Sequence, residues 1–232
     1  MKVLLIAPNY LRVYSYVSEE ATMVAPPMGM AYVAGYLRDN GVDVEILDLA
    51  ALRSDEKMER KLIAESGADM VAMAGTTNTI MLCYDLAKIS KEVLPDAKVV
   101  VGGPHPTMEP ARTLEECRQI DYCVVSEAEE TMLELARGVE DKDVLGISFR
   151  DSKGNIIVNA SRPLIKDLDS LAFPARDLLP QDKYWTPGVR RYPYAIMMTS
   201  RGCPYSCTFC SNFRTQGKQF RARSPENVLA EI

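Results

Sequence analysis

Short apolar segments alternate with helix-like segments over roughly the first 140 residues of this 232-residue chain. The helix-like segments stop at glycines or before a proline, as at Gly41, Gly67 and Leu94-Pro95. We expect strands at 2–7, 42–47, 70–74, 98–101 and 122–125, and helices at 29–40, 56–66, 79–93 and 129–138. Apolar strands separated by helices predict an α/β fold with a parallel sheet covered on both faces. We expect a doubly wound, flavodoxin-like (Rossmann-type) domain with strand order 2-1-3-4-5.

The composition fits a globular intracellular protein. Hydrophobic residues make up 47% of the chain and charged residues 25%, as in ordinary globular domains. The net charge of −5 argues against a nucleic-acid interface, which would be basic. No apolar run approaches the roughly 20 residues of a transmembrane helix, and the N-terminal apolar run is too short for a signal peptide. We therefore expect a cytoplasmic protein whose cysteines stay reduced.

Ligands of doubly wound sheets bind at the carboxyl ends of the strands, near the point where the strand order reverses. The loops expected there are short, small and polar. Gly102 and Gly103 would let a large planar or phosphate-bearing ligand approach the backbone. The candidate binding residues of these loops are Asn9, Tyr10, Thr76, Thr77, Gly102, Gly103, His105, Ser126 and Glu127.

Three cysteines lie close together near the C-terminus, in the spacing C-x3-C-x2-C. They are Cys203, Cys207 and Cys210, and Phe209 precedes the last of them. Thiolates in such spacings ligate iron–sulfur clusters, usually four to a cluster. Because no fourth cysteine follows, three thiolates would leave one iron of a 4Fe–4S cluster open for a substrate or cofactor.

Two other interpretations of these cysteines stay open. A structural zinc site normally has four ligands, and the only histidine of the chain, His105, lies far upstream. A disulfide with a spare thiol would need an oxidising compartment. Cys83, Cys117 and Cys123 lie among apolar neighbours, where we expect small buried side chains.

The cysteine motif and its lead-in, Thr199-Ser200-Arg201-Gly202-Cys203-Pro204, resemble those of radical S-adenosylmethionine (SAM) enzymes. The resemblance implies that the open iron binds SAM and that the reduced cluster cleaves it to a 5′-deoxyadenosyl radical. Phe209 would lie beside the adenine. A flavodoxin- or ferredoxin-type protein would supply the electron.

The N-terminal part resembles the cobalamin-binding domain that precedes many radical SAM barrels. The similar strings are 26–38, 100–107 and 126–131. Many such domains contain D-x-H-x-x-G, whose histidine ligates cobalt, and this chain does not. If cobalamin binds, we expect it without a histidine ligand. For His105, a role near the ligand and a structural hydrogen bond are both open.

We expect three parts: a cobalamin-binding domain at 1–142, a hairpin and linker at 143–193, and the start of a radical SAM barrel at 194–232. The segment 195–199 would be the first barrel strand, and Ser224 would cap a helix. A complete barrel needs roughly another 150–200 residues, judged from ordinary barrel size. We therefore expect the chain to be an N-terminal part, inactive alone.

Four basic residues follow the cysteines, at Arg214, Lys218, Arg221 and Arg223. They could contact the SAM carboxylate or an electron donor, but we favour ordinary solvated charges. For the intact parent enzyme, the resemblance implies methylation of an unactivated carbon of a small-molecule substrate. The alternatives are a radical cyclase or other rearrangement with an empty cobalamin domain as scaffold, and a non-catalytic cobalamin-binding module with a structural cysteine site.

Overall fold

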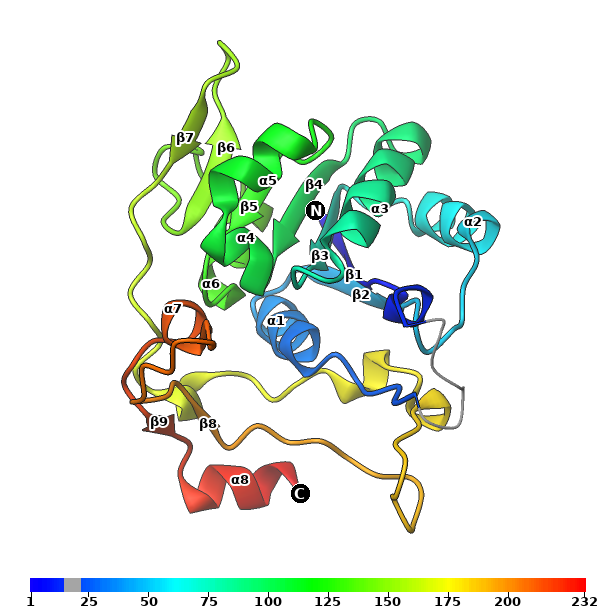
Figure 1. Cartoon of the computed structure of the whole chain (residues 1–232), viewed down its shortest axis with the longest axis vertical. Coiled ribbons are helices and arrows are strands. Elements are labelled where there is room, and N and C mark those ends of the chain that lie inside the picture. Colours follow the sequence, from blue (N-terminus) through cyan, green and yellow to red (C-terminus); the bar gives the residue numbers. More distant parts are fainter. Residues whose placement is uncertain (15–21) are drawn as a thin grey trace.

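The computed structural model describes residues 1–14 and 22–232. A seven-stranded sheet in the order β2-β1-β3-β4-β5-β6-β7 forms its centre (Figure 1). The five strands from β2 to β5 in that order pair in parallel, and β6 and β7 pair antiparallel. The strands are β1 (Lys2–Ala7), β2 (Asp43–Asp48), β3 (Met70–Ala74), β4 (Lys98–Gly102), β5 (Tyr122–Val124), β6 (Ile147–Arg150) and β7 (Ile156–Val158). The predicted doubly wound α/β fold and its strand order are confirmed.

Helices cover both faces of the sheet. Helices α1 (Met28–Asp39) and α6 (Glu129–Ala136) pack on the face to which Val3 and Leu5 point. Helices α2 (Glu56–Ser66), α3 (Ile80–Val93) and α5 (Pro110–Glu116) pack on the face to which Leu4 and Ile6 point. Successive side chains of a strand point to opposite faces, so a strand buried on both faces is apolar throughout.

Two short helices after β4 were not predicted from the sequence. The segment after Gly103, expected as a loop, forms α4 (Pro104–Met108), and α5 follows it directly. A proline stands at the first position of each helix, where its fixed φ and missing N–H are compatible with the helix. The two helices lead the chain from β4 to β5.

The predicted hairpin is present and belongs to the sheet. Its strands β6 and β7 extend the sheet beyond β5. The Asp151 carboxylate accepts hydrogen bonds from the Lys153 and Asn155 amides and closes the loop between them. The boundary expected at residue 142 stays a prediction, although the sheet continues past it.

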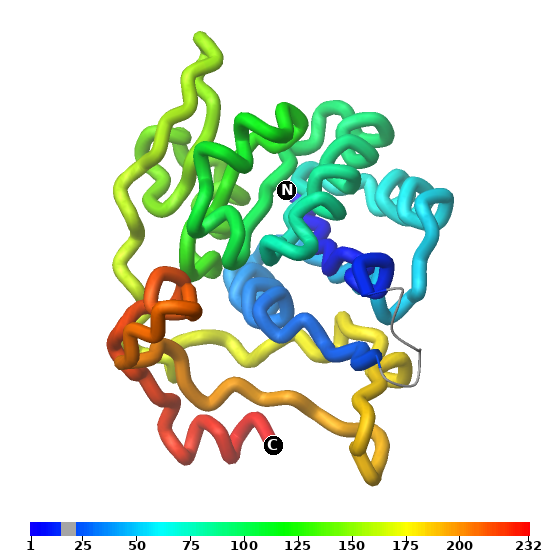
Figure 2. The backbone as a smooth tube through the Cα atoms, in the orientation of Figure 1, coloured from blue at the N-terminus to red at the C-terminus, as the bar shows by residue number. Residues whose placement is uncertain are grey.

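The segment after the hairpin wraps back beneath α1, as the yellow part of the tube in Figure 2 shows. The Ala175 amide donates to the Ala31 carbonyl at 2.9 Å, and Arg38 pairs with Asp177 at 2.6 Å. The Tyr184 hydroxyl donates to Asp48 at 3.0 Å. Three short 3-10 turns punctuate this linker, at Leu168–Ser170, Arg176–Leu178 and Gln181–Lys183. A fourth, Tyr10–Arg12, follows β1.

The C-terminal segment runs beside the domain and carries the cysteines. It contains a two-stranded ladder of β8 (Ser200–Arg201) and β9 (Arg221–Ala222), and the helices α7 (Asn212–Thr215) and α8 (Pro225–Glu231). The Ser224 hydroxyl caps α8 by accepting from the Asn227 amide, as predicted. The prediction of a strand at 195–199 is wrong. Within residues 1–14 and 22–232, that segment pairs with no other strand.

None of the helices formed by the described residues combines the length and the apolar character needed to cross a bilayer.

Candidate functional site

A cavity of about 370 Å³ opens at the carboxyl edge of the sheet. Its floor is apolar and comes from the sheet and the helices α1 and α6, through Leu5, Ala72, Val100, Val124, Met30, Val33 and Met132. Its rim is polar and includes Thr107, Ser126 and Glu127. The opposite wall comes from the C-terminal segment, through Met198, Arg201, Thr215 and Gln216. Ligand pockets combine an apolar body with a few placed polar groups in this way, at volumes of about 300–1,000 Å³.

Small residues line the cavity and leave its volume open to a ligand. Gly29, Ala72, Ala74, Gly102 and Gly103 all line the cavity. A Cβ on Gly29 would meet no atom within 4 Å, and a Cβ on Gly102 would come no closer than 3.7 Å to Val124. Gly103 has a φ of +94°, which favours glycine because other residues are strained there. The site is therefore a cradle in which backbone is accessible to a broad ligand.

The structure brings four of the predicted crevice residues together. Gly102, Gly103, Ser126 and Glu127 all line this cavity. Gly102 ends β4, and Ser126 and Glu127 follow β5, so neighbouring parallel strands deliver them to the same edge. The Ser126 amide donates to the Thr107 hydroxyl at 2.9 Å, which fixes the loop after β5 against α4.

The other predicted crevice residues are not among those that line the cavity, and each has a local partner. Asn9 is buried and donates to the Ser54 carbonyl at 3.0 Å. The Tyr10 hydroxyl donates to the Met23 carbonyl. The Thr76 amide donates to the Thr79 hydroxyl at the start of α3.

His105 and Thr77 contact each other beside the cavity. His105 Nδ1 lies 3.2 Å from the Thr77 hydroxyl, and the His105 amide donates to the Gly75 carbonyl at 3.1 Å. The first turn of α4 directs the residue toward the loop after β3. Its Nε2 is buried without a hydrogen-bond partner in the described part of the chain. Their role as ligand contacts stays a prediction.

The cysteines lie in a loop that runs from β8 to β9. Cys207 is exposed, Cys203 and Cys210 are half-buried, and Phe209 is 92% exposed. The Cys203 amide donates to the Gly217 carbonyl, and the Cys210 amide to the Cys207 carbonyl. Among residues 1–14 and 22–232, no three His, Cys, Asp or Glu side chains stand in a metal-binding arrangement. The three thiols are thus on one loop but not gathered, and their ligand role stays a prediction.

Gly202 sets how the cysteine loop begins. Its φ is +85°, and a Cβ there would lie 2.0 Å from the Gln219 carbonyl oxygen. Only glycine fits this approach of the two ends of the loop. The glycine of the Arg-Gly-Cys lead-in therefore has a steric function that the sequence motif alone did not explain.

Buried ion pairs join the cysteine loop to the rim of the cavity. Arg201, in β8, contacts Glu127 at 3.2 Å and Glu129 at 2.6 Å. Arg221, in β9, contacts Glu127 at 3.0 Å. The four side chains are between 3% and 9% exposed. Burial lowers the pKa of Arg201, but the attraction of Glu129 and Glu127 outweighs it, so the pKa lies above its ordinary value.

The expectation of solvated charges is wrong for two of the four basic residues. Arg221 and Arg223 are 5% and 8% exposed. Arg223 donates to the Tyr32 hydroxyl at 3.0 Å and pairs with Glu231. Arg214 and Lys218 are exposed, as expected. Arg221 and Arg223 are two residues apart, a strand-like spacing that could have indicated a shared orientation, but their partners Glu127 and Tyr32 lie far away in the sequence.

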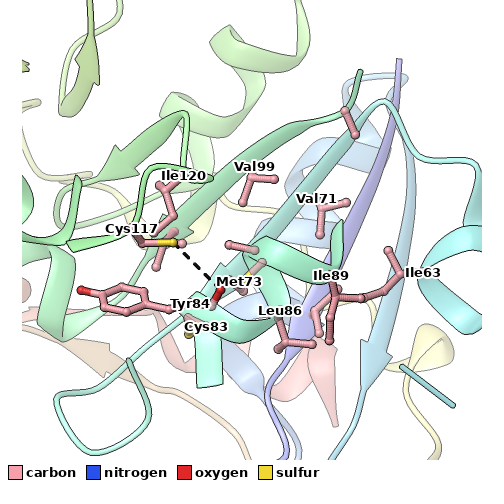
Figure 3. Close-up of a cluster of buried hydrophobic side chains, with 14 of the residues drawn as sticks. Ile63, Val71, Met73, Cys83, Tyr84, Leu86, Ile89, Val99, Cys117 and Ile120 are labelled. Carbon is pink, nitrogen blue, oxygen red and sulfur yellow. Dashed lines mark hydrogen bonds between the residues drawn. The ribbon is translucent and has the colours of Figure 1, made fainter. Parts of the chain in front are cut away.

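The remaining cysteines are core residues, as predicted, and Figure 3 shows Cys83 and Cys117 within one cluster of buried side chains. Cys83, Cys117 and Cys123 are at most 2% exposed. The Cys117 thiol contacts the Tyr84 carbonyl at 3.9 Å. Burial raises the pKa of Cys83 and of Cys123 to about 12.

A protein-family model described as the B12 binding domain matches residues 14–136. The match runs from before α1 to the end of α6 and includes the strands β2 to β5, which supply most of the cavity floor together with α1 and α6.

Two curated relatives align over the whole chain. An uncharacterized methyltransferase of Pyrococcus horikoshii is 38% identical over 100% of this chain and 50% of its own length. The anaerobic magnesium-protoporphyrin IX monomethyl ester cyclase of Rubrivivax gelatinosus is 34% identical over 100% of this chain and 42% of its own length. The chain thus spans about half the length of the curated relatives it matches, or less.

A solved structure shares the fold. The radical SAM methyltransferase TsrM of Kitasatospora setae, with cobalamin and a 4Fe–4S cluster bound, superposes with a TM-score of 0.72. The sequences are 22% identical, and the superposition covers 99% of this chain and 44% of TsrM.

Proposed function

Since this chain belongs to the family of B12 binding domains, we propose that it is the cobalamin- and cluster-binding part of a radical SAM enzyme. We infer that the parent enzyme methylates an unactivated carbon of a small-molecule substrate. One observation carries the proposal: the segment that bears Cys203, Cys207 and Cys210 also supplies a wall of the cavity. A ligand in the cavity would therefore lie close to a cofactor on the cysteine loop.

The cavity fits part of a large, mostly apolar ring with polar substituents. Gly102 and Gly103 would hold such a ligand close to the backbone, and the apolar floor would exclude water from it. The Ser126 hydroxyl donates to the Thr215 carbonyl at 2.7 Å, which closes the rim against the C-terminal segment. We propose that cobalamin binds without a histidine on cobalt, because His105 is not among the cavity-lining residues.

The cysteine loop would hold the cluster. Cys203, Cys207 and Cys210 would ligate three irons and leave the fourth open for SAM. The exposed Phe209 ring is available to lie against the adenine. When bound, the cluster supplies the electron for reductive cleavage of SAM, and methylcobalamin supplies the methyl group.

The chain's own residues would orient these groups. Gly202 fixes the start of the cysteine loop, and Arg201 fixes it to the rim of the cavity. The linker holds the C-terminal segment in place, since the Asp169 carboxylate accepts from the Ser224 amide at 2.9 Å. We propose an external flavodoxin- or ferredoxin-type reductant and a cytoplasmic location, since such a cluster needs a reducing compartment.

The curated relatives support methylation and leave one alternative. The Pyrococcus relative is named a methyltransferase and the Rubrivivax relative a cyclase. A radical cyclisation, with the first domain as scaffold, is therefore the second candidate. The two differ in whether methylcobalamin is consumed by the parent enzyme during turnover.

Filling the cavity tests the cobalamin site. Ala74 ends β3, is exposed and lines the cavity. Ala74→Leu should lower the affinity for hydroxocobalamin by about tenfold or more, since tenfold corresponds to only about 1.4 kcal/mol. Ala64→Leu places the same side chain on the exposed face of α2 and is the matched control. Equal affinity in both variants would contradict this site.

The reaction is tested in the parent enzyme. With substrate, SAM and reductant, the parent should consume methylcobalamin faster than its Cys207→Ala variant. Substrate conversion to a product that contains no methyl group from labelled methylcobalamin would favour the cyclase. Equal consumption by both proteins would contradict the radical SAM assignment.

A further inference from the structure

The buried ion pairs beside the cavity connect parts of the chain that lie far apart in sequence. Glu127 follows β5 of the first domain, and its carboxylate contacts Arg201 and Arg221, which lie 74 and 94 residues later. Glu129 contacts Arg201 as well. We call the group of Glu127, Glu129, Arg201 and Arg221 the carboxylate clasp.

The clasp sits where the cysteine loop begins and ends. Arg201 and Arg221 are direct partners in the ladder between β8 and β9. All three cysteines lie in the loop between these two residues. The two ends of the loop are therefore bound to a single side chain, Glu127.

The charges explain why the ladder needs a carboxylate. Like charges directly opposite each other on paired strands repel, and here both guanidinium groups are buried. Two glutamates against two arginines leave the clasp neutral. Because an unpaired buried charge is strongly destabilising, removal of Glu127 would leave the two arginines with only one carboxylate between them.

Further hydrogen bonds hold the Glu127 carboxylate and the Arg221 guanidinium in place. Its carboxylate accepts from the Ile165 amide at 2.8 Å, and Arg221 donates to the Gln216 carbonyl at 2.8 Å. Both glutamates line the cavity, as does Arg201. The side chains that would face a ligand in the cavity are thus the ones that hold the cysteine loop.

We propose that Glu127 is a positioning residue that fixes both ends of the cysteine loop against the rim of the cavity. Its role is to set the place of the loop relative to the cavity, and it ligates nothing on the loop itself. The functional side of this inference rests on the proposed function, whereas the ordering of the loop does not.

Hydrogen exchange of the cofactor-free chain tests the ordering. In Glu127→Gln, amides within 202–220 should exchange at least about tenfold faster, because the loop is released locally while the sheet stays closed. Amides of β1 and β3 should keep their wild-type rates, which shows that the fold is intact. Glu130→Gln is the matched control, since Glu130 pairs with Arg162 of the linker at 3.0 Å and does not touch the cysteine loop.

A second variant covers the case in which Glu127→Gln does not fold. Glu127→Asp keeps the charge but shortens the side chain. Its loop amides should therefore exchange faster than those of wild type. Where Glu127→Gln also folds, the Glu127→Asp rates should lie between those of wild type and Glu127→Gln. Wild-type exchange of the loop in each folded Glu127 variant would overturn the proposal. An equal increase in Glu130→Gln would overturn it too, because the effect would not belong to the clasp.

The electron paramagnetic resonance spectrum of the reconstituted, reduced chain provides the functional readout. Addition of SAM should change the cluster signal in wild type and in Glu130→Gln, and should change it less in Glu127→Gln. An identical response in Glu127→Gln would overturn the positioning role. If wild type assembles no cluster, the proposed function fails, and the exchange experiment still decides whether Glu127 orders the loop.

Discussion

Gly35 in α1 lies directly against the carbonyl of Phe173 in the linker. A Cβ on Gly35 would stand 2.2 Å from the Phe173 carbonyl oxygen. Two residues further on, the Ala175 amide donates to the Ala31 carbonyl. Backbone thus packs on backbone where the linker crosses α1, and the linker in turn holds the C-terminal segment through Asp169.

Gly35→Ala should destabilise the chain because the linker would have to move. Overpacking at such a contact costs typically about 1–3 kcal/mol, and we expect a loss of about 2 kcal/mol in the free energy of unfolding. Urea denaturation followed by circular dichroism measures it. Gly29→Ala, in the same helix with open space around its Cβ, should leave the stability unchanged or raise it by up to about 1 kcal/mol. Equal stability of the two variants would contradict this packing.

The six cysteines should divide into two sets of three by reactivity. The thiolate is the nucleophile, and burial raises the pKa of Cys83 and Cys123 to about 12 and also raises that of Cys117. Iodoacetamide applied to the folded, metal-free chain should therefore modify Cys203, Cys207 and Cys210 first. Peptide mass spectrometry identifies the sites, and denatured protein is the control in which all six react. Early modification of Cys83 would contradict the described core.

Asp48 should make stability depend on pH. Burial raises its pKa above the ordinary value, although hydrogen bonds from the Ala51 amide, the Tyr184 hydroxyl and the Ala50 amide act in the opposite direction. The folded state therefore keeps the Asp48 proton to a higher pH than the unfolded state, whose pKa is about 3.9. The stabilisation is complete below that pH and is lost as the pH rises through the folded-state pKa.

Asp48→Asn removes this titration. Its free energy of unfolding, relative to wild type, should increase between about pH 4 and pH 7. Asp177→Asn is the contrasting variant, because the hydrogen bond from Arg38 lowers the pKa of Asp177. The stability of Asp177→Asn relative to wild type should fall slightly as the pH rises from below the lowered folded-state pKa to just above the unfolded-state pKa of about 3.9, and should stay level at higher pH. The change should be small because that ion pair is largely exposed. A pH-independent difference for Asp48→Asn would contradict a buried Asp48 carboxyl with a raised pKa.

The sheet could be predicted because its signals are local. The strand at Lys2–Ala7 is apolar on both faces, and Gly41 and Gly67 end the helices that separate the strands. The cysteine spacing is local too, and so is the helix cap at Ser224. Each of these features depends on residues within a few positions of one another.

The joining of the two parts could not be predicted in this way. The segment that contains Arg221 and Arg223 resembles a solvated loop in its composition. The burial of the two arginines depends on their partners Glu127, Tyr32 and Glu231. Glu127 and Tyr32 lie far away in the sequence. His105 follows a strand at the correct edge, but the turn of α4 directs it away from the cavity toward Thr77. The segment 195–199 was expected as the first strand of a barrel, whereas a strand also needs a neighbour to pair with.

One ultraviolet–visible spectrum tests whether the chain holds both an iron–sulfur cluster and cobalamin. The chain is reconstituted anaerobically with iron and sulfide, incubated with hydroxocobalamin, desalted, and recorded before and after dithionite. We expect a broad iron–sulfur absorption that bleaches on reduction, together with retained corrinoid bands. A folded protein that keeps neither chromophore would contradict the assignment of this chain as a cobalamin- and cluster-binding part.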